Sequence, residues 1–368
     1  MSEFSRREFL KALGISLLIS TNANSLNTWA AGAEPPFRSL VIGDSLIWGQ
    51  GLEEKDKTYT IVSDWLRDEA FSGREVDLKV KAHSGATIRF DPKEAEAYRR
   101  AGRDEGYYYQ GEVNVSFPSM WKQVEMAAAE YEAAGAEQGA DLVMLTAGIT
   151  DITVEGVLDP FGKEKKLREM IRTVCRDRVG ELLEHIASHN PNSLIAVIGY
   201  FPMISPHSSG SKVLNGWLET LGFPGFLQPL ANNPVVRTLF FKRILNNGIE
   251  RSRIWNEESD HNLQLAVEKL NASAGRQQAI FIKTPLTEQQ AVESPETVLF
   301  RARGNGSVTD PLYEQRKVNC KTSLDELKRS TGIDYGVKRC AMAGVGHPDI
   351  TGSRLYAEAI IESLKSVL

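Results

Sequence analysis

Outside its first 33 positions, the sequence has no long run of apolar residues, and it has only three cysteines. Cys175, Cys320 and Cys340 lack the spacing of metal ligands, so the sequence does not indicate a zinc site. No later apolar run approaches the roughly 18 residues that a membrane-spanning helix needs. We therefore expect no metal, and no stable membrane span once the N-terminal segment is removed.

Patterns that bind nucleic acids or nucleotides are also missing. The chain has 43 basic and 48 acidic residues, a net charge of -5, and no long basic run. No Gly-x-Gly-x-x-Gly sequence follows the first strand, and there is no phosphate-binding loop. Nucleic acid is therefore not expected as a partner, and no cofactor is expected at the site.

The first 33 residues have the three regions of a targeting segment. Arg6 and Arg7 precede an apolar stretch over 13–19, and Ala31-Gly32-Ala33 provides small residues for cleavage. This pattern is similar to a twin-arginine signal, and the alternative is an amphipathic N-terminal helix. It predicts export by the twin-arginine machinery to the periplasm or the cell exterior, with a mature chain starting near Glu34.

Short apolar runs alternate with longer segments of helical periodicity, which predicts a doubly wound α/β fold with a five-stranded, mostly parallel sheet. The predicted strands are Ser39–Ile42, Val76–Ala82, Leu142–Thr146, Leu194–Ile198 and Ala279–Ile282. The predicted helices are Tyr59–Ala70, Met120–Ala134, Lys166–Ser188, His261–Leu270 and Ser353–Val367. We expect one domain over residues 34–368, with the last helix closing one edge of the sheet.

Two stretches near residues 92–118 and 206–256 interrupt this alternation and are predicted to be insertions. The first contains Tyr107, Tyr108 and Tyr109, and the second is rich in large apolar side chains. Loops at the carboxyl ends of parallel strands form the ligand crevice, so these insertions either shape a substrate pocket or only pack on the core. In an oxidising compartment Cys320 and Cys340 could bridge a loop, whereas Cys175 is predicted to be buried.

A nucleophilic serine is predicted at the end of the first strand. The apolar run Leu40-Val41-Ile42 leads directly into Gly43-Asp44-Ser45, which places the hydroxyl beside the backbone amides of the next helix. Gly, Asp and Ser are also ordinary turn formers, so the tripeptide alone does not establish a catalytic site.

A histidine near the other end of the chain is the predicted general base. His347 lies just before the last helix, and imidazole titrates in the range that activates a serine. His83, beside a crevice loop, is the second choice.

Gly43-Asp44-Ser45-Leu46, Gly85, the Gly148–Asp151 loop and His347-Pro348 resemble, in order and context, the blocks of the SGNH (GDSL) hydrolases. The resemblance implies a flavodoxin-like fold and an esterase in which Ser45 is the nucleophile and His347 its base. It also implies that the Ser45 and Gly85 amides, together with the residue at position 150, hold the oxyanion.

Two positions depart from the family pattern. The third block has Asn where this chain has Thr150, a shorter side chain with a single donor, and loss of one oxyanion donor typically costs about a hundredfold in rate. The family aspartate, three residues before the histidine, is Gly344 here. The orientation of His347 is then left to a backbone carbonyl near Gly344, giving a Ser-His dyad, or to Asp349 or Asp334. Asp349 could instead cap the last helix.

The leading hypothesis is an exported ester hydrolase whose substrate carries either an acyl chain or an acetylated glycan. A second hypothesis is a binding protein for a lipid or glycan that keeps the fold with weakened catalysis. An acyltransferase would use the same serine and differ only in the acceptor of the acyl group.

Overall fold

The computed structural model describes residues 34–107, 109–213, 234–303 and 306–368. Contacts between residues divide the chain into two units, Met1–Pro36 and Phe37–Leu368. The second unit contains the helices and strands. The predicted targeting segment lies outside the described residues.

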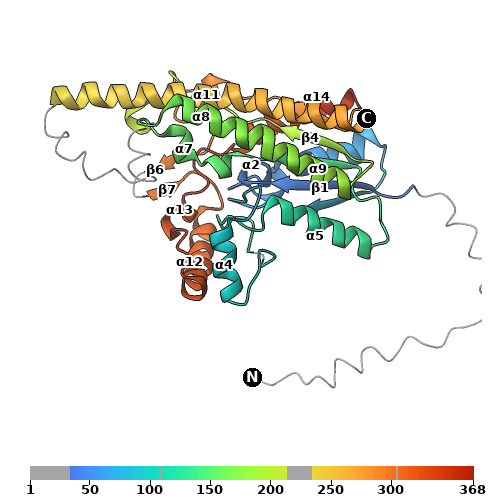
Figure 1. The fold of residues 1–368 in the computed structure, drawn as a ribbon. Coiled ribbons are helices and arrows are strands. Elements are labelled where there is room, and N and C mark those ends of the chain that lie inside the picture. Colours follow the sequence, from blue (N-terminus) through green and yellow to red (C-terminus); the bar gives the residue numbers. More distant parts are fainter. Residues whose placement is uncertain (1–33, 108, 214–233, 304–305) are drawn as a thin grey trace, which may run out of the picture. The chain divides into compact units, whose positions relative to one another are not determined.

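Five parallel strands form the central sheet in the order β2-β1-β3-β4-β5 (Figure 1). They are β1 (Phe37–Gly43), β2 (Val76–Val80), β3 (Leu142–Thr146), β4 (Leu194–Ile198) and β5 (Ala279–Ile282). Each predicted strand is present, which confirms the predicted doubly wound α/β fold. The change of direction in strand order falls at β1, and the crevice of such a sheet opens where the order reverses.

Helices cover both faces of the sheet. One face carries α3 (Thr58–Trp65). The other carries α5 (Met120–Ala133), α9 (Val179–His189) and α11 (Pro234–Ala274), with α9 in contact with both α5 and α11. The last helix, α14 (Ile350–Lys365), packs against α3 and the edge strand β5. Every residue of β3 is buried, which explains its continuous apolar run.

Two helices are longer or less regular than their periodicity predicted. The segment expected at Lys166–Ser188 is α8 (Glu164–Ile171) joined to α9 by a π-helical stretch, Arg172–Arg178. The segment expected at His261–Leu270 is the end of α11, which begins inside the predicted second insertion. Buried side chains recur along the same helix at Ile244, Ile254 and Leu263, so apolar periodicity extends across the predicted boundary.

A second group of helices packs beside the carboxyl ends of the strands. It comprises α4 (Pro92–Arg100), α12 (Tyr313–Thr331) and α13 (Val337–Ala341), and α4 and α12 lie together in Figure 1 although they are far apart in sequence. The region of Cys320 was predicted to be a loop, and it is helical instead. Its apolar residues Cys320, Leu324 and Leu327 form one buried face against the 90–117 segment.

The remaining short elements lie near these two groups. They are α2 (Ser45–Trp48), the 3-10 turns Glu54–Asp56 and Glu288–Gln290, the π turn Leu66–Ala70, α6 (Ile149–Ile152), α7 (Val154–Leu158) and the hairpin β6 (Ala302–Arg303) and β7 (Ser307–Val308).

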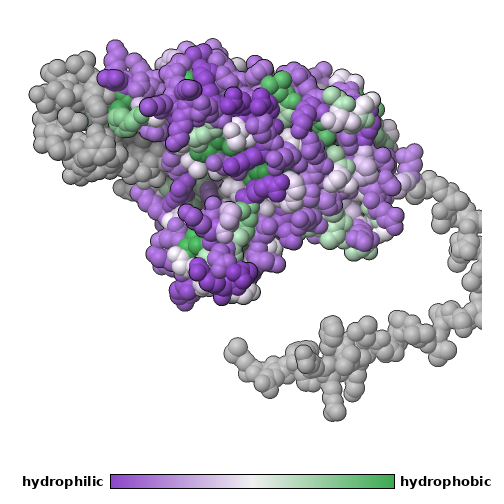
Figure 2. Space-filling model, viewed as in Figure 1, coloured by the Kyte–Doolittle hydropathy of each residue, from purple (hydrophilic) through white to green (hydrophobic). Residues whose placement is uncertain are grey.

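Hydrophilic residues cover most of the coloured surface in Figure 2, and apolar residues occur there only in small, separate groups. Within the part of the chain that the structure describes, no helix combines the length and apolar character needed to cross a lipid bilayer.

Candidate active site

Ser45 begins the short helix α2 immediately after strand β1. Its side chain is 7% exposed, at the end of the sheet where the parallel strands finish. The turn depends on Gly43, whose φ is +142° and where a Cβ atom would lie 2.4 Å from the Thr146 carbonyl oxygen of β3. Only glycine allows β1 and β3 to approach this closely at the turn.

Asp44 fixes the backbone on the other side of the turn. Its buried carboxylate accepts hydrogen bonds from the Leu46 N–H at 3.0 Å, the Thr146 hydroxyl at 2.8 Å and the Tyr200 hydroxyl at 2.5 Å. Burial raises the pKa of Asp44 above its usual value, against the lowering effect of these donors. Asp44 therefore caps α2 and holds the turn, and does not face the reacting atoms.

Ser45 and His347 meet although 302 positions separate them. Ser45 Oγ and His347 Nε2 lie 2.7 Å apart, within hydrogen-bonding distance. This is the geometry in which an imidazole removes the proton of a nucleophilic hydroxyl. The two residues chosen from sequence as nucleophile and base are thus in direct contact.

The backbone around His347 is held by the segment before β6. The Phe300 N–H donates to the His347 carbonyl at 2.8 Å, and the Gly346 N–H donates to the Phe300 carbonyl at 2.9 Å. Leu299 and Pro348 form an antiparallel bridge, and the His347 N–H closes a tight turn onto the Gly344 carbonyl at 3.1 Å. These bonds fix the backbone from which the imidazole extends.

Burial lowers the pKa of His347 to about 4. The positive charge of Arg316 lowers it further, and the nearby backbone of residues 343–345 opposes the shift. Nδ1 is inaccessible to water and has no partner of hydrogen-bonding geometry among the described residues. The neutral, proton-accepting form of the base therefore prevails at neutral pH.

Neither of the two carboxylates proposed to orient His347 is available for that role. The Asp349 carboxylate accepts hydrogen bonds from the Thr351 and Gly352 N–H groups at 2.8 and 3.0 Å, and so caps α14. Asp334 is exposed and pairs with Lys328 at 2.6 Å. The prediction of Asp349 as a partner of His347 is wrong, because its position at the start of the helix directs the carboxylate to the helix amides.

The space beside Gly344 is filled by a buried ion pair that the sequence did not reveal. A Cβ atom at Gly344 would lie 2.4 Å from Oδ2 of Asp310 and 2.9 Å from Nη2 of Arg316. Arg316 donates to both carboxylate oxygens of Asp310, at 2.9 and 2.6 Å, and its Nε donates to the Ala341 carbonyl at 3.0 Å. Both side chains are fully buried, so the pair supports the loop that leads to His347.

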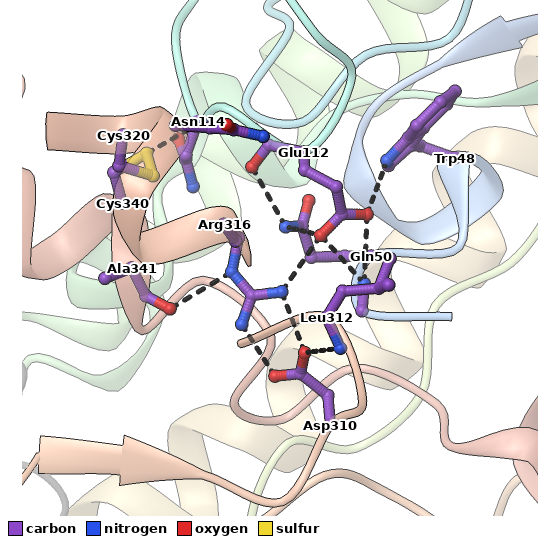
Figure 3. A network of polar contacts seen from close by, with 12 residues as sticks. Trp48, Gln50, Glu112, Asn114, Asp310, Leu312, Arg316, Cys320, Cys340 and Ala341 are labelled. Carbon is purple, nitrogen blue, oxygen red and sulfur yellow. Dashed lines mark hydrogen bonds and ion pairs between the residues drawn. A yellow bond between two sulfur atoms is a disulfide. The ribbon is translucent and has the colours of Figure 1, made fainter. Parts of the chain in front are cut away.

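Glu112 extends this cluster toward the nucleophile (Figure 3). It accepts hydrogen bonds from Arg316, the Trp48 indole N–H and the Gln50 amide, each at 2.9 Å. Trp48 ends α2, the helix that Ser45 begins. The cluster thus connects the segments that carry Ser45 and His347. Sequence reasoning missed it because an isolated Arg, Asp or Glu gives no signal that it will be buried.

Cys320 and Cys340, whose bridging the sequence left open, form a disulfide that joins α12 to α13. Cys340 is seven positions before His347, in the segment that Arg316 also holds. Cys175 is buried with a free thiol, as expected.

Of the predicted oxyanion donors, the Gly85 and Ser45 N–H groups border the same cavity as His347. Neither has a hydrogen-bond partner within residues 34–107, 109–213, 234–303 and 306–368. Thr150 also borders the cavity, but its hydroxyl donates to the Ala86 carbonyl at 2.6 Å. The prediction that the Thr150 hydroxyl holds the oxyanion is therefore wrong for this arrangement, since its only proton already has an acceptor.

His83 is far from this role. It is fully buried, and its two ring nitrogens lie within hydrogen-bonding distance of the Ser84 and Tyr109 carbonyls, at 3.0 and 3.2 Å. Its function is to hold the 109–111 segment against the turn after β2.

A cavity of about 1420 Å³ opens at Ser45 and His347. Both predicted insertions contribute to its lining, through Glu94, Asn114 and Ser116 from the first and Lys212, Val213 and Trp255 from the second. Tyr107 and Tyr109 do not line it; Tyr109 packs against Phe117 instead. The aromatic residues Trp217, Phe223 and Phe226 lie outside the described residues.

No protein-family model and no curated protein matches the chain. Among solved structures, the chain is similar to an extracellular lipase from Streptomyces rimosus, with 13% identity and a TM-score of 0.43 over 90% of this chain and 100% of that one. It is also similar to phospholipase A1 from Streptomyces albidoflavus NA297, with 12% identity and a TM-score of 0.42 over 89% and 99% of the two chains.

A third similar structure is the lipase Lip_vut3 from a goat rumen metagenome, with 13% identity and a TM-score of 0.41 over 89% of this chain and 97% of that one.

Proposed function

We propose that the protein is a serine ester hydrolase that works through an acyl-enzyme on Ser45. The observation that carries the proposal is the 2.7 Å hydrogen bond between Ser45 Oγ and His347 Nε2, in the wall of a cavity at the carboxyl ends of the parallel strands. A serine hydroxyl is a weak nucleophile unless an adjacent base accepts its proton, and this pair satisfies that requirement.

The reaction follows from the positions of these two groups. Ser45 Oγ attacks the ester carbonyl carbon while its proton passes to His347 Nε2. The tetrahedral intermediate then collapses, and the imidazolium returns the proton to the leaving alcohol. Water next attacks the acyl-enzyme with His347 as the base, and the acid product leaves with Ser45 restored.

The charge that forms on the carbonyl oxygen needs donors that are not already used. The Ser45 and Gly85 N–H groups have no other acceptor among the described residues and border the cavity, which supports their role as two such donors. Donors held in place before the reaction cost no reorganisation when the charge forms.

The proposed substrate is an ester of one of two kinds. It has either a long acyl chain or an acetyl group carried by a sugar. The cavity volume exceeds what a short acyl group fills, and its lining mixes apolar side chains such as Phe90, Met203 and Trp255 with charged ones. On the basis of the N-terminal segment, we propose that the protein acts in the periplasm or outside the cell.

The test compares hydrolysis of p-nitrophenyl esters of increasing chain length by wild type, Ser45→Ala and Ser188→Ala, using protein without the N-terminal 33 residues. Ser188 is an exposed serine on α9 and serves as the matched control. A fluorophosphonate probe followed by mass analysis identifies the labelled serine. We expect a burst and a Ser45 adduct in wild type and Ser188→Ala, and neither in Ser45→Ala.

The alternatives give different results. A binding protein would form no adduct in wild type while remaining folded. An acyltransferase would form the adduct but turn over mainly when a second alcohol is added, because the acyl group would then leave to that alcohol faster than to water.

A further inference from the structure

An amide side chain lies beside Gly85, whose backbone N–H is one of the two proposed oxyanion donors. Asn114 lines the same cavity as Ser45, Gly85 and His347. Its side-chain amide makes no hydrogen bond with any residue that the structure describes. This half-buried amide borders the proposed reaction centre, where its two N–H groups remain available to a ligand.

The position of Asn114 relative to Gly85 is closely defined. Gly85 has φ +80°, and a Cβ atom on it would lie 2.4 Å from Oδ1 of Asn114. The amide group therefore lies directly over Gly85, in the space that a larger residue at position 85 would occupy. A half-turn about the terminal side-chain torsion exchanges the amide oxygen and nitrogen, so the NH₂ group can occupy either place.

The backbone on both sides of Asn114 is anchored. The Val115 N–H donates to the Ser84 carbonyl at 3.1 Å, and the Asn114 N–H points to Sγ of Cys340 at 3.3 Å (Figure 3). One anchor is the turn that carries Gly85, and the other is the disulfide in the segment leading to His347. The side chain thus extends from a fixed backbone position, as a preorganised donor requires.

The side chain of Thr150 does not supply a free donor of this kind. The Thr150 hydroxyl has a single proton, which it donates to the Ala86 carbonyl at 2.6 Å. Donation to a substrate would require that bond to break. Asn114, in contrast, has two amide protons and no described acceptor for either.

We propose that Asn114, from the 92–118 segment, supplies the side-chain donor that stabilises the tetrahedral oxyanion, together with the Ser45 and Gly85 N–H groups. This inference rests on the proposed esterase function. It assigns a catalytic role to a residue outside the loop that follows β3. The 92–118 segment then completes the reaction centre and does not only cover it.

The experiment measures kcat and KM for a p-nitrophenyl ester with wild type, Asn114→Ala, Asn114→Asp, Thr150→Val and Asn192→Ala. Asn192 is an exposed asparagine bonded to Gln138 and serves as the matched control. Binding of a trifluoromethyl ketone, which forms a charged tetrahedral adduct with a serine, is measured for the same proteins. Circular dichroism melting shows whether each variant is folded.

For Asn114→Ala we expect kcat to fall by about a hundredfold or more, with KM changed only a few-fold, because the lost donor acts in the transition state. Asn114→Asp should be at least as slow, since a carboxylate would face the oxyanion. Affinity for the ketone should fall by a similar factor. Thr150→Val should lose less than Asn114→Ala, and Asn192→Ala should match wild type.

Three results would overturn the inference. The first is an active wild type whose kcat and ketone affinity survive Asn114→Ala. The second is a loss in Asn114→Ala that appears in KM alone. The third is a wild type without Ser45-dependent turnover, which would contradict the proposed function itself and remove the inference with it.

Discussion

The imidazole of His347 has its two nitrogens in different environments. Nε2 faces the Ser45 hydroxyl, while Nδ1 is enclosed by protein and has no carboxylate partner among the described residues. An aspartate at that nitrogen would stabilise the imidazolium and raise its pKa. Here burial and Arg316 act in the opposite direction, and the base is easily kept neutral.

The pH dependence of kcat/KM should show this directly. With the pKa of free His347 lowered to about 4, the active neutral form is present above that pH. We expect kcat/KM to rise through a single ionisation near pH 4 and to be level at neutral pH, whereas an unperturbed histidine would give a rise near about 6.5. The measurement is a pH profile of ester hydrolysis from about pH 3 to about pH 8.

His261→Gln, a change at an exposed histidine on α11, is the control and should leave the profile unchanged. A rise centred at pH 6 or above would contradict the prediction. The lowered pKa of His347 also makes the free energy of unfolding depend on pH. Between about pH 4 and about pH 6.5 the unfolded chain binds more protons than the folded one. The contribution of His347 to stability is therefore complete above about pH 6.5 and is lost as the pH falls toward about 4.

At the scale of elements, α14 begins at Ile350, three positions after His347, and its first turn is capped by Asp349. The cap joins the base to the helix that packs on α3 and β5. From the sequence, Asp349 could either cap helix α14 or accept a hydrogen bond from His347. The choice follows from backbone geometry, because an N-cap side chain points back at the amides of its own helix.

Replacing Asp349 should therefore affect stability and not the chemistry. For Asp349→Ala we expect unfolding free energy to fall by about 1 kcal/mol through loss of the cap. The acid limb of the pH profile should stay where it is in wild type. Urea unfolding followed by circular dichroism measures the first quantity, and ester hydrolysis measures the second.

Thr351→Ala, at an exposed position of the same turn, is the matched control for stability. A shifted acid limb, or a loss of turnover by several orders of magnitude in folded Asp349→Ala, would instead identify Asp349 as the partner of His347.

At the scale of the whole molecule, the buried cluster of Arg316, Asp310 and Glu112 joins segments that are far apart in the sequence. It connects the end of α2 with the loop before His347 (Figure 3). Breaking a buried ion pair leaves a charge without a partner, which costs much more than losing an exposed pair.

Arg316→Met should consequently lower unfolding free energy by about 3–5 kcal/mol, because two carboxylates lose their shared partner. Adding Asp310→Asn should recover part of this loss. Arg67→Met, which removes exposed ion pairs with Asp64 and Asp68, should lower the unfolding free energy far less than Arg316→Met does. Denaturant unfolding of all four proteins measures these differences, and equal losses for Arg316→Met and Arg67→Met would contradict the role assigned to the cluster.

The sheet and the reacting pair could be predicted from local patterns. Apolar runs such as Leu142–Thr146 are long enough and apolar enough to specify buried strands by themselves. Ser45 follows the first of these strands, and the topology of a parallel sheet places such a residue at the crevice. The helix α12 was missed because its buried face is narrow and most of its residues are charged or polar.

The sequence by itself determined the five strands and their order in the chain, the turn at Gly43-Asp44-Ser45, and the choice of Ser45 and His347, because each depends on residues close together in the chain or on a motif in a fixed order. Only the tertiary structure decided what surrounds them. Asp310 and Arg316 fill the space at Gly344, Asn114 stands over Gly85, and Asp349 turns to its own helix. These arrangements depend on packing between segments far apart in sequence, where burial and the competition for hydrogen-bond partners decide each side chain's role.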